Sequence, residues 1–358
     1  MFDPAAIAAW GLPTAHRLPP GPLADDTFGA LLARCETQRV LGFLGSATAD
    51  GFPVTDAQRE QVEERWSAWL GHTVRVERRV LDVLDVLDRA GIAGLVLKGV
   101  ALSHSAYPDP NLRVFGDVDV LIQPGRLHDA AATLVAAFGT ARAEPELRPG
   151  YDDRFGREVL VPVGAVEVDL HRTFVNGAYG MRIDLDALFR APDRVTIGGR
   201  AVGVLAPPDR LLHAAYASTL SDWPPRLVAY RDLAQILTHD DPDPDAVLAR
   251  AAAWRAEAVL ATALTDVWRT LRLTDRPPLL EWAERFHATR RDRILLAAAR
   301  GPARGYTSQL TSLAAIPGLL ARIAFLRAVL WPSREYRVAR DLGRFGLVGR
   351  GARRARRA

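Results

Sequence analysis

Apolar residues recur at helical spacing along most of the first 90 residues of the chain. Segments 21–50 and 56–90 both show this period, with polar and charged residues between the apolar positions. Thr55 or Asp56 would cap the start of the second segment, because short polar side chains accept hydrogen bonds from the free backbone amides of a first helical turn. We therefore predict an N-terminal helical region over residues 1–88.

The pattern changes after Gly91, where short apolar runs alternate with glycine-rich turns. Two pairs of alternating segments meet at tight turns, one at Gly164 and one at Gly198–Gly199, and each pair predicts a β-hairpin. The expected strands are 94–99, 114–122, 157–164, 165–174 and the two halves of 194–207, and the expected helices are 100–107 and 125–139. The predicted fold class is α+β, with a small mixed sheet in a core at residues 89–205.

After Pro208 the chain is again mostly helical. Proline-rich breaks separate the expected helices at 224–225, 241–245 and 277–278. No period of 20–50 residues repeats, which excludes a solenoid. We predict a C-terminal helical domain over residues 206–340 and a basic tail over residues 341–358.

The most apolar part of this region is segment 313–331, which Pro317, Arg322 and Arg327 interrupt. A helix that spans a bilayer needs about 20 consecutive apolar residues, so this segment is a poor candidate for a membrane span. Lying on a membrane surface is an alternative, but we expect a buried amphipathic helix.

Length and composition are those of an ordinary globular protein. The 358 residues are 49% hydrophobic and 25% charged, which suits two or three domains with cores of their own. A single cysteine, Cys35, excludes an internal disulfide bond, and the N-terminus lacks the pattern of a signal peptide. We therefore expect a cytoplasmic protein.

The net charge of +4 is unevenly distributed, because the last ten residues contain five arginines and no acidic residue. We expect this tail to bind anions weakly. Nucleic acid, a membrane or an acidic partner is less favoured as its specific ligand.

Asp117 and Asp119 form an Asp-x-Asp motif within the alternating segment 114–122. Residues two apart on a strand point to the same face, so the two carboxylates would share one side, about 7 Å apart at their Cα atoms. A divalent cation that takes oxygen ligands from both would offset their repulsion. An exposed strand face explains a bare Asp-x-Asp as well, but the apolar neighbours of this motif favour a central strand.

Segment 165–174 offers further acidic groups, since Glu167, Asp169 and His171 alternate on one face of the predicted strand. If this strand neighbours the first, one of its carboxylates completes a cluster of three. Such a cluster holds two Mg²⁺ ions about 3.5–4 Å apart for in-line phosphoryl or nucleotidyl transfer. The residues alone leave the choice between Glu167 and Asp169 open.

Lys98 is the only lysine of the chain, so 45 of its 46 basic residues are arginines. It precedes Gly99 between a predicted strand and a predicted helix, where backbone amides and a helix N-terminus can meet a phosphate. An ammonium is a compact point charge that a guanidinium does not reproduce, which favours a role at a phosphate. A lysine that caps a strand end is the alternative. Arg113 is a second candidate for phosphate binding.

Together, the stretch AGIAGLVLKGVALSHSAYPDPNLRVFGDVDVLI at 90–122 and the downstream VEVDLH resemble an uncharacterised nucleotidyltransferase-like family of the polymerase β nucleotidyltransferase superfamily. The resemblance covers about residues 85–175, and a looser one extends over 210–237. The looser part contains His213, Arg226 and Asp232, for which ordinary structural roles are favoured.

The resemblance implies a set of site residues. Asp117 and Asp119 would bind Mg²⁺, and Asp169 would be the third carboxylate, with Glu167 as its rival. Lys98 and Gly99 would hold the nucleotide phosphates, and His171 is a further candidate at the nucleotide site.

The function that the resemblance implies is Mg²⁺-dependent transfer of an NMP group, first of all AMP, from an NTP. The acceptor would be a small molecule, a peptide or a protein, and natural-product tailoring is one setting for such a reaction. A glycosyltransferase with a metal-binding Asp-x-Asp is an alternative, but it needs parallel βαβ units where this chain has helices.

A non-catalytic nucleotide-binding or regulatory module, such as an antitoxin-like protein, is another alternative. Two departures from the family pattern favour it: Gly99-Val100 replaces the usual Gly-Ser or Gly-Gly, and the spacing from Gly99 to Asp117 is longer than in the simplest members.

Overall fold

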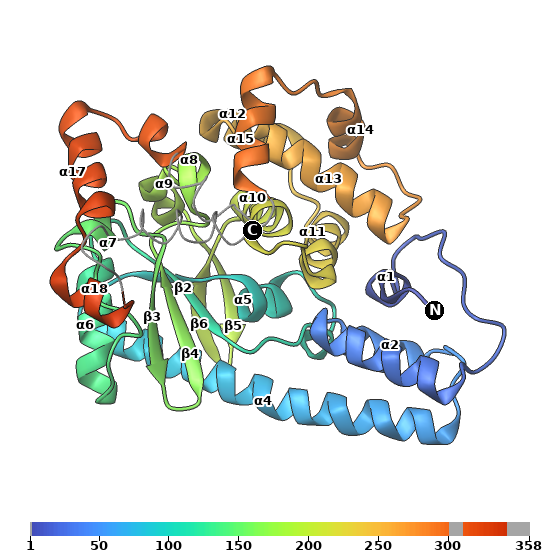
Figure 1. Ribbon diagram of the computed structural model, residues 1–358. Coiled ribbons are helices and arrows are strands. Elements are labelled where there is room, and N and C mark those ends of the chain that lie inside the picture. Colours follow the sequence, from blue (N-terminus) through green and yellow to red (C-terminus); the bar gives the residue numbers. More distant parts are fainter. Residues whose placement is uncertain (1, 301–310, 342–358) are drawn as a thin grey trace.

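The computed structural model describes residues 2–300 and 311–341, and its helices surround a single sheet (Figure 1). The N-terminal helices are α1 (Pro4–Ala8), α2 (Asp25–Thr37), α3 (Leu41–Ala49) and α4 (Asp56–Arg89). The prediction of helices over 21–50 and 56–90 is confirmed.

Helix α4 is the long helix that runs beneath the sheet in Figure 1. It begins at a capping box, in which Thr55 Oγ1 accepts from the Gln58 amide and the Gln58 side chain accepts from the Thr55 amide. It ends before Gly91, whose φ of +65° is a conformation that glycine adopts without steric cost.

The sheet has six strands in the order β3-β4-β2-β1-β6-β5. They are β1 (Gly94–Val96), β2 (Val118–Ile122), β3 (Glu158–Val163), β4 (Val166–His171), β5 (Asp193–Ile197) and β6 (Arg200–Val204). Pairs β2/β4 and β1/β6 are parallel, and the other three pairs are antiparallel. The expected mixed sheet, both hairpins and the adjacency of the two acidic strands are therefore confirmed.

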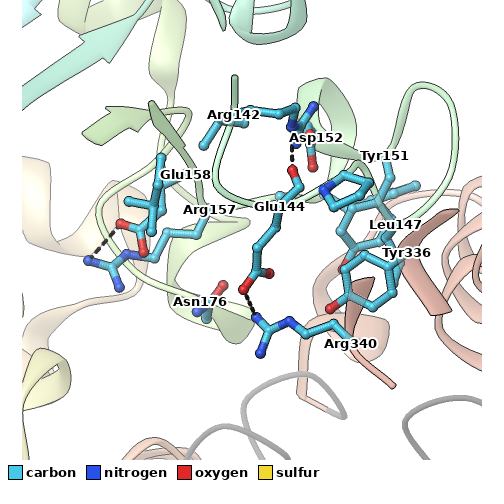
Figure 2. Close-up of a pocket in the computed structure, with 15 residues that line it drawn as sticks. Arg142, Glu144, Leu147, Tyr151, Asp152, Arg157, Glu158, Asn176, Tyr336 and Arg340 are labelled. Atoms are coloured by element: carbon cyan, nitrogen blue, oxygen red, sulfur yellow. Dashed lines mark hydrogen bonds and ion pairs between the residues drawn. The ribbon is translucent and has the colours of Figure 1, made fainter. Parts of the chain in front are cut away.

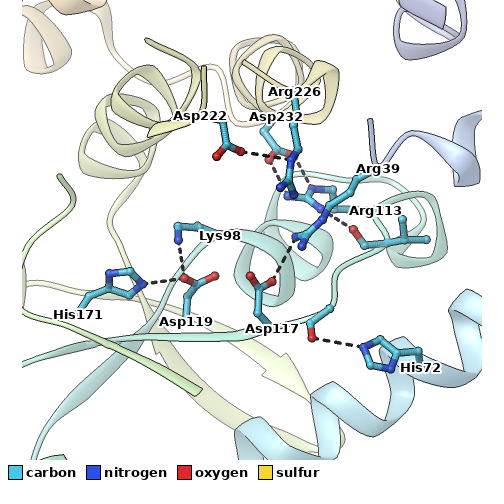
Figure 3. Close-up of polar contacts among 12 residues, drawn as sticks. Arg39, His72, Lys98, Arg113, Asp117, Asp119, His171, Asp222, Arg226 and Asp232 are labelled. Carbon is cyan, nitrogen blue, oxygen red and sulfur yellow. Dashed lines mark hydrogen bonds and ion pairs between the residues drawn. The ribbon is translucent and has the colours of Figure 1, made fainter. Parts of the chain in front are cut away.

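Two predicted strands are shorter than expected. The strand expected at 94–99 ends at Val96, because helix α5 (Lys98–Ser105) already begins at Lys98. The strand expected at 114–122 begins at Val118, one residue after Asp117. The premise that both aspartates lie within one strand is wrong for Asp117, although its side chain still points the same way as that of Asp119 (Figure 3).

Besides α5, the helices between the strands are η1 (Pro110–Leu112), α6 (Leu127–Phe138), α7 (Tyr151–Arg154), α8 (Gly177–Gly180) and α9 (Leu185–Arg190). Only some of the helices close the apolar face of the sheet. The second half of α4 and helix α6 pack on the valine-rich face, where Val118, Val120, Val161 and Val168 are buried in one core. The polar residues of β2 and β4 therefore point to the opposite side of the sheet.

The C-terminal region supplies the helices above the polar face, including α10 and α11 (Figure 1). The elements of the whole C-terminal region are α10 (Pro207–Tyr216), a π-helical turn (Ala217–Ser221), α11 (Leu227–His239), α12 (Pro244–Trp254), α13 (Glu257–Leu271), α14 (Pro278–Arg285), α15 (Arg290–Ala299), α17 (Leu319–Leu330) and α18 (Arg334–Ala339), of which α17 and α18 lie beside α6 and α7. The expected helical region after Pro208 is confirmed, whereas most of the basic tail lies outside the described residues.

A second core joins the N-terminal and C-terminal helices. Helix α1 packs with α11 and α13, and Arg231 on α11 donates from its guanidinium to the Ala8 carbonyl at 3.0 Å. Because this core and the sheet core share helix α4, the division at 88/89 and 205/206 stays a proposal.

The prediction of a buried helix at 313–331 is wrong for one side of α17, because Leu320 is 83% exposed there. No helix within 2–300 and 311–341 combines the length and the apolar sequence needed to cross a bilayer.

Candidate active site

A cavity of about 300 Å³ opens between the polar face of the sheet and the helices above it. Lys98, Asp117 and Asp119 lie on its floor, and residues of α10 and α11 form its roof (Figure 3). Five of the site residues expected from the sequence, including Gly99 and Arg113, thus share one cavity.

Asp119 is the central residue of this floor and is 3% exposed. Its Oδ1 accepts from Lys98 Nζ at 2.5 Å and lies 2.7 Å from His171 Nε2 (Figure 3). Burial disfavours the Asp119 carboxylate, but Lys98 and His171 outweigh this effect and hold the pKa of Asp119 far below its usual range. Asp119 is therefore a charged carboxylate although it is buried.

Asp169 lies directly beside Asp119, because the two residues are register partners in the parallel pair β2/β4. Asp119, Asp169 and His171 each offer a ligand atom, and these atoms lie within 4.8 Å of one another. Oδ1 of Asp169 is buried and has no hydrogen-bond partner among the described residues. Burial, and then the negative charges of Asp119 and Glu158, raise the pKa of Asp169 to about 8.

These three side chains fit a bound cation. A buried carboxylate oxygen without a partner is costly, and a cation would both pair with it and restore its charge. Two carboxylates suit a hard ion such as Mg²⁺, whereas the imidazole suits transition metals better. The group can therefore hold a divalent metal ion.

Glu167, the rival of Asp169, lies outside this group. It is exposed, and its register partner is Pro162 on β3. Asp117 is also outside the three-residue group, but it lines the cavity and forms an ion pair with Arg39 at 3.3 Å. Its charge contributes to the raised pKa of Asp169, so the two carboxylates are electrostatic neighbours.

Lys98 and Gly99 owe their positions to the tight connection between β1 and α5. Lys98 has φ +45°, a left-handed conformation that costs a non-glycine residue about 1 kcal/mol or more. At Gly99, an added Cβ would lie 2.5 Å from Phe115 Cβ, so only glycine lets α5 approach this loop. The observed packing explains Gly99 without any ligand.

Arg113 is part of a complete buried ion pair. Its Nε and Nη2 donate to the two oxygens of Asp232 at 2.7 and 2.9 Å, and Tyr107 Oη donates to the same carboxylate at 2.6 Å. Burial disfavours the guanidinium, but Asp232 outweighs it and raises the pKa of Arg113. The pair lines the cavity, but Nε and Nη2 of Arg113 and both carboxylate oxygens of Asp232 already take part in hydrogen bonds with one another.

The other residues of the looser resemblance also line the cavity. His213 is buried against Phe174, with ring centroids 4.5 Å apart, and burial lowers the pKa of His213 to about 3. Arg226 pairs with Asp222 at 3.3 Å.

Two residues were missed by the sequence reading. Arg39 follows α2 with φ +56° and reaches Asp117, and nothing in the sequence distinguishes it from the other arginines. Glu158 lies 3.4 Å from His171 Nδ1, as measured from Oε2. The predicted hairpin at Gly164 could have identified Glu158. Pairing residues outward from this turn, in the antiparallel register of the hairpin, sets Glu158 opposite His171.

A second cavity of about 290 Å³ lies along the edge strand β3 (Figure 2). Ion pairs line it: Arg142 with Asp152, Arg157 with Glu158, and Glu144 with Arg340. Arg157 lines both cavities, and Glu158 joins the second cavity to His171. The group of Asp119, Asp169 and His171 on β2 and β4 therefore lies near the junction of the two cavities.

A mixed sheet with paired aspartates at a lysine–glycine connection defines the class of nucleotidyltransferases that the sequence resembles. The family model described as an uncharacterised nucleotidyltransferase matches residues 25–271. This match covers more than half of the chain, so the chain belongs to this family and is a nucleotidyltransferase. No curated protein matches the chain significantly.

Solved structures give weaker likenesses. The solution structure of the antibiotic-resistance factor ANT(2'')-Ia has 17% identity and a TM-score of 0.37, covering 52% of this chain and 93% of that chain. A nucleotidyltransferase-like protein from Paracoccidioides brasiliensis has 16% identity and a TM-score of 0.37, covering 58% and 96%. A tRNA-processing enzyme has 14% identity and a TM-score of 0.25, covering 74% and 77%. These scores are too low to carry an argument.

Proposed function

We propose that the protein transfers an NMP group from an NTP to a hydroxyl or phosphate acceptor, with Mg²⁺ as its metal and AMP as the first group to test. The observation that carries this proposal is the strand register that sets Asp119 beside Asp169, together with the ion pair between Lys98 and the Asp119 carboxylate.

Asp119 and Asp169 are the proposed ligands of the metal, with Asp117 as an additional ligand. Asp117 would exchange its contact with Arg39 for the metal. Two ions are proposed because Asp117 is an electrostatic neighbour of Asp169, which lies beside Asp119. Bound Mg²⁺ stabilises the charge that develops on the transferred phosphoryl group and orients it. His171 Nε2 positions Asp119 by its contact with Oδ1.

The NTP is proposed to lie in the cavity that contains Lys98. The Lys98 ammonium and the Arg39 guanidinium would offset the charge of its phosphates, since within the described residues their ion pairs are with the aspartates that the metal would take. Gly99 keeps α5 close to this site. Arg113 contributes to the wall of the proposed nucleotide cavity through its pair with Asp232.

In the reaction, an acceptor oxygen forms a bond to the α-phosphorus of the NTP, and the bond from that phosphorus to the bridging oxygen breaks. Pyrophosphate leaves, and the proton of an acceptor hydroxyl goes to Asp169. The metal would hold Asp169 in its charged form, which can accept this proton.

The acceptor is proposed to lie in the cavity along β3, on the side of Asp169 away from Lys98. The charges that line this cavity are paired with one another, which suits a neutral, polar acceptor better than a strongly charged one. Tyr151 and Tyr336 add aromatic rings to its wall (Figure 2).

The direct test replaces Asp117 and Asp119 together by asparagine. We expect no Mg²⁺-dependent release of pyrophosphate across candidate acceptors, together with a retained unfolding transition. Glu167→Gln is the matched control, because Glu167 lies on the neighbouring strand β4 but outside the metal-ligating group, and it should retain activity within about twofold. Full activity of the double variant would refute the mechanism.

The non-catalytic module remains the second candidate, favoured by Gly99-Val100 at the phosphate turn. Calorimetry with ATP and Mg²⁺, followed by the pyrophosphate assay, separates the two functions. Binding without release across hydroxyl-bearing small molecules, peptides and proteins would favour the module.

A further inference from the structure

Exposed apolar side chains are concentrated near the C-terminal end of the described chain. Ten large hydrophobic residues are exposed within 2–300 and 311–341, and six of them lie between 319 and 338. These six are Leu319, Leu320, Ile323, Leu326, Trp331 and Val338. This segment also lies beyond residues 25–271, so the family match does not explain it.

Helix α17 is apolar on two sides, only one of which is packed. Phe325 and Ala328 are buried, and the Phe325 ring packs edge-on against Phe155 with centroids 5.5 Å apart. On the outer side, Leu319, Ile323 and Leu326 follow at the i, i+4, i+7 spacing of one helical face, with exposures of 73%, 51% and 38%.

The segment after α17 is fixed to the protein body. The Ser333 amide donates to the Leu147 carbonyl at 2.8 Å, and Arg148 Nε donates to the Trp331 carbonyl at 2.5 Å. The Trp331 side chain is nevertheless 56% exposed. The apolar surface is therefore presented by a docked helix that keeps its place against α7.

The same part of the chain is basic. Residues 319–341 contain five arginines and two acidic residues, a net charge of +3. Arg322, Arg327 and Arg334 are exposed next to the apolar side chains. Leucine and isoleucine on one helical face, flanking arginines and an interfacial tryptophan are the features of helices that lie in the headgroup region of a bilayer.

We propose that the outer face of α17, together with Trp331 and the flanking arginines, docks the protein onto the surface of a membrane that contains anionic lipids. Both contributions that stable surface binding needs are present, namely buried apolar area and attraction to acidic headgroups. A second copy of the chain fits less well, because two such basic faces repel each other. Nucleic acid fits less well, because it would leave the leucine and isoleucine side chains in water.

The test is flotation of the full chain with vesicles of phosphatidylcholine containing about 30% phosphatidylglycerol, compared with pure phosphatidylcholine. We expect binding to the anionic vesicles that weakens as salt is added. The variant Ile323→Glu/Leu326→Glu should weaken this binding about tenfold or more, because it places two negative charges in the docking face.

Ile294→Glu is the matched control, since Ile294 is 58% exposed on α15, outside the docking face. It should bind the anionic vesicles as the unchanged protein does, and both variants should keep the thermal unfolding midpoint. Activity plays no part in this readout, so the proposal stands or falls independently of the proposed reaction.

Three results would overturn the proposal. One is the absence of binding to anionic vesicles, and another is equal binding by the double variant. The third is a dimer or an RNA complex that the double variant abolishes while vesicle binding is absent, which would assign the face to another partner.

Discussion

A buried ion pair and a partly buried ionic cluster lie at one cavity, and they differ in how completely their polar atoms are used. In the pair of Arg113 with Asp232, both carboxylate oxygens accept from the guanidinium, and Tyr107 adds a third hydrogen bond. In the cluster around Asp119 and Asp169, Lys98 Nζ and His171 Nε2 both contact the same oxygen of Asp119. Oδ1 of Asp169 lacks a hydrogen-bond partner among the residues described.

The difference indicates which pair holds the fold and which is left for a ligand. A satisfied buried pair is stable as it is, whereas an incomplete one keeps an electrostatic cost that a cation would remove. The complete pair connects the loop before β2 to α11, and the incomplete cluster spans two neighbouring strands.

The largest expected effect is on the complete pair. Asp232→Ala should lower the free energy of unfolding by about 3–5 kcal/mol, because it leaves the buried Arg113 guanidinium without its counter-charge. Urea unfolding measures this loss. The double variant Arg113→Met/Asp232→Leu should recover much of it, and a small loss in Asp232→Ala alone would contradict the structural role.

Mg²⁺ should act on the incomplete cluster and raise the free energy of unfolding. At a concentration about 100 times its Kd, a ligand that binds only the folded protein adds about 2.7 kcal/mol. Urea unfolding with Mg²⁺ or with EDTA measures this increment. Asp169→Asn should reduce it strongly and Glu167→Gln should preserve it. An increment that follows Glu167 instead would reverse the choice between the two.

His213 is a buried, neutral group of the same cavity, and it forms no ion pair with a carboxylate in the part of the chain that the structure describes. Its pKa is about 3 in the folded protein and about 6.5 when unfolded, so only the unfolded chain binds this proton between those values. The contribution of neutral His213 to the free energy of unfolding is complete above pH 6.5. It falls as the pH decreases, by about 2 kcal/mol at pH 5.

The measurement for His213 is the difference in unfolding free energy between the unchanged protein and His213→Gln at pH 7.5 and pH 5. The difference is needed because Asp169, with its raised pKa, gives a slope of the opposite sign. A difference that does not change with pH would show that the pKa of His213 is not lowered in the folded protein.

The smallest expected effect concerns Lys98. Lys98→Arg keeps the charge next to Asp119, but the broader guanidinium must fit a connection where φ is +45°. We expect binding of ATP with Mg²⁺ to weaken about tenfold, or about 1.4 kcal/mol, in calorimetry. Unchanged affinity would mean that any cation suffices at this position.

The sequence predicted what depends on local periodicity and on neighbouring segments. The two hairpins and the capping of α4 follow from alternation and from turn and capping residues. The adjacency of β2 and β4 was a condition of the predicted cluster and rested on nearness in sequence, and the structure meets this condition. The side chain of Asp169 was predicted as one of two alternatives, because alternation along β4 puts Glu167 on the same face and only the register separates them.

Contacts between distant segments were beyond the sequence reading. The Arg113–Asp232 pair joins residues 119 positions apart, and the Arg39–Asp117 pair joins residues 78 apart. With 45 arginines in the chain, composition gives no reason to prefer these two. The exposure of α17 was missed because both of its sides are apolar, so its sequence resembles that of a buried helix.

The position of α1 has a consequence for how the chain is made. Ala8 and the rest of this helix are buried against α11 and α13, whose first residues are Leu227 and Glu257. At the usual rate of protein synthesis, the ribosome needs on the order of tens of seconds to supply those partners. During that interval the apolar side chains of α1 that contact α11 and α13 lack these partners.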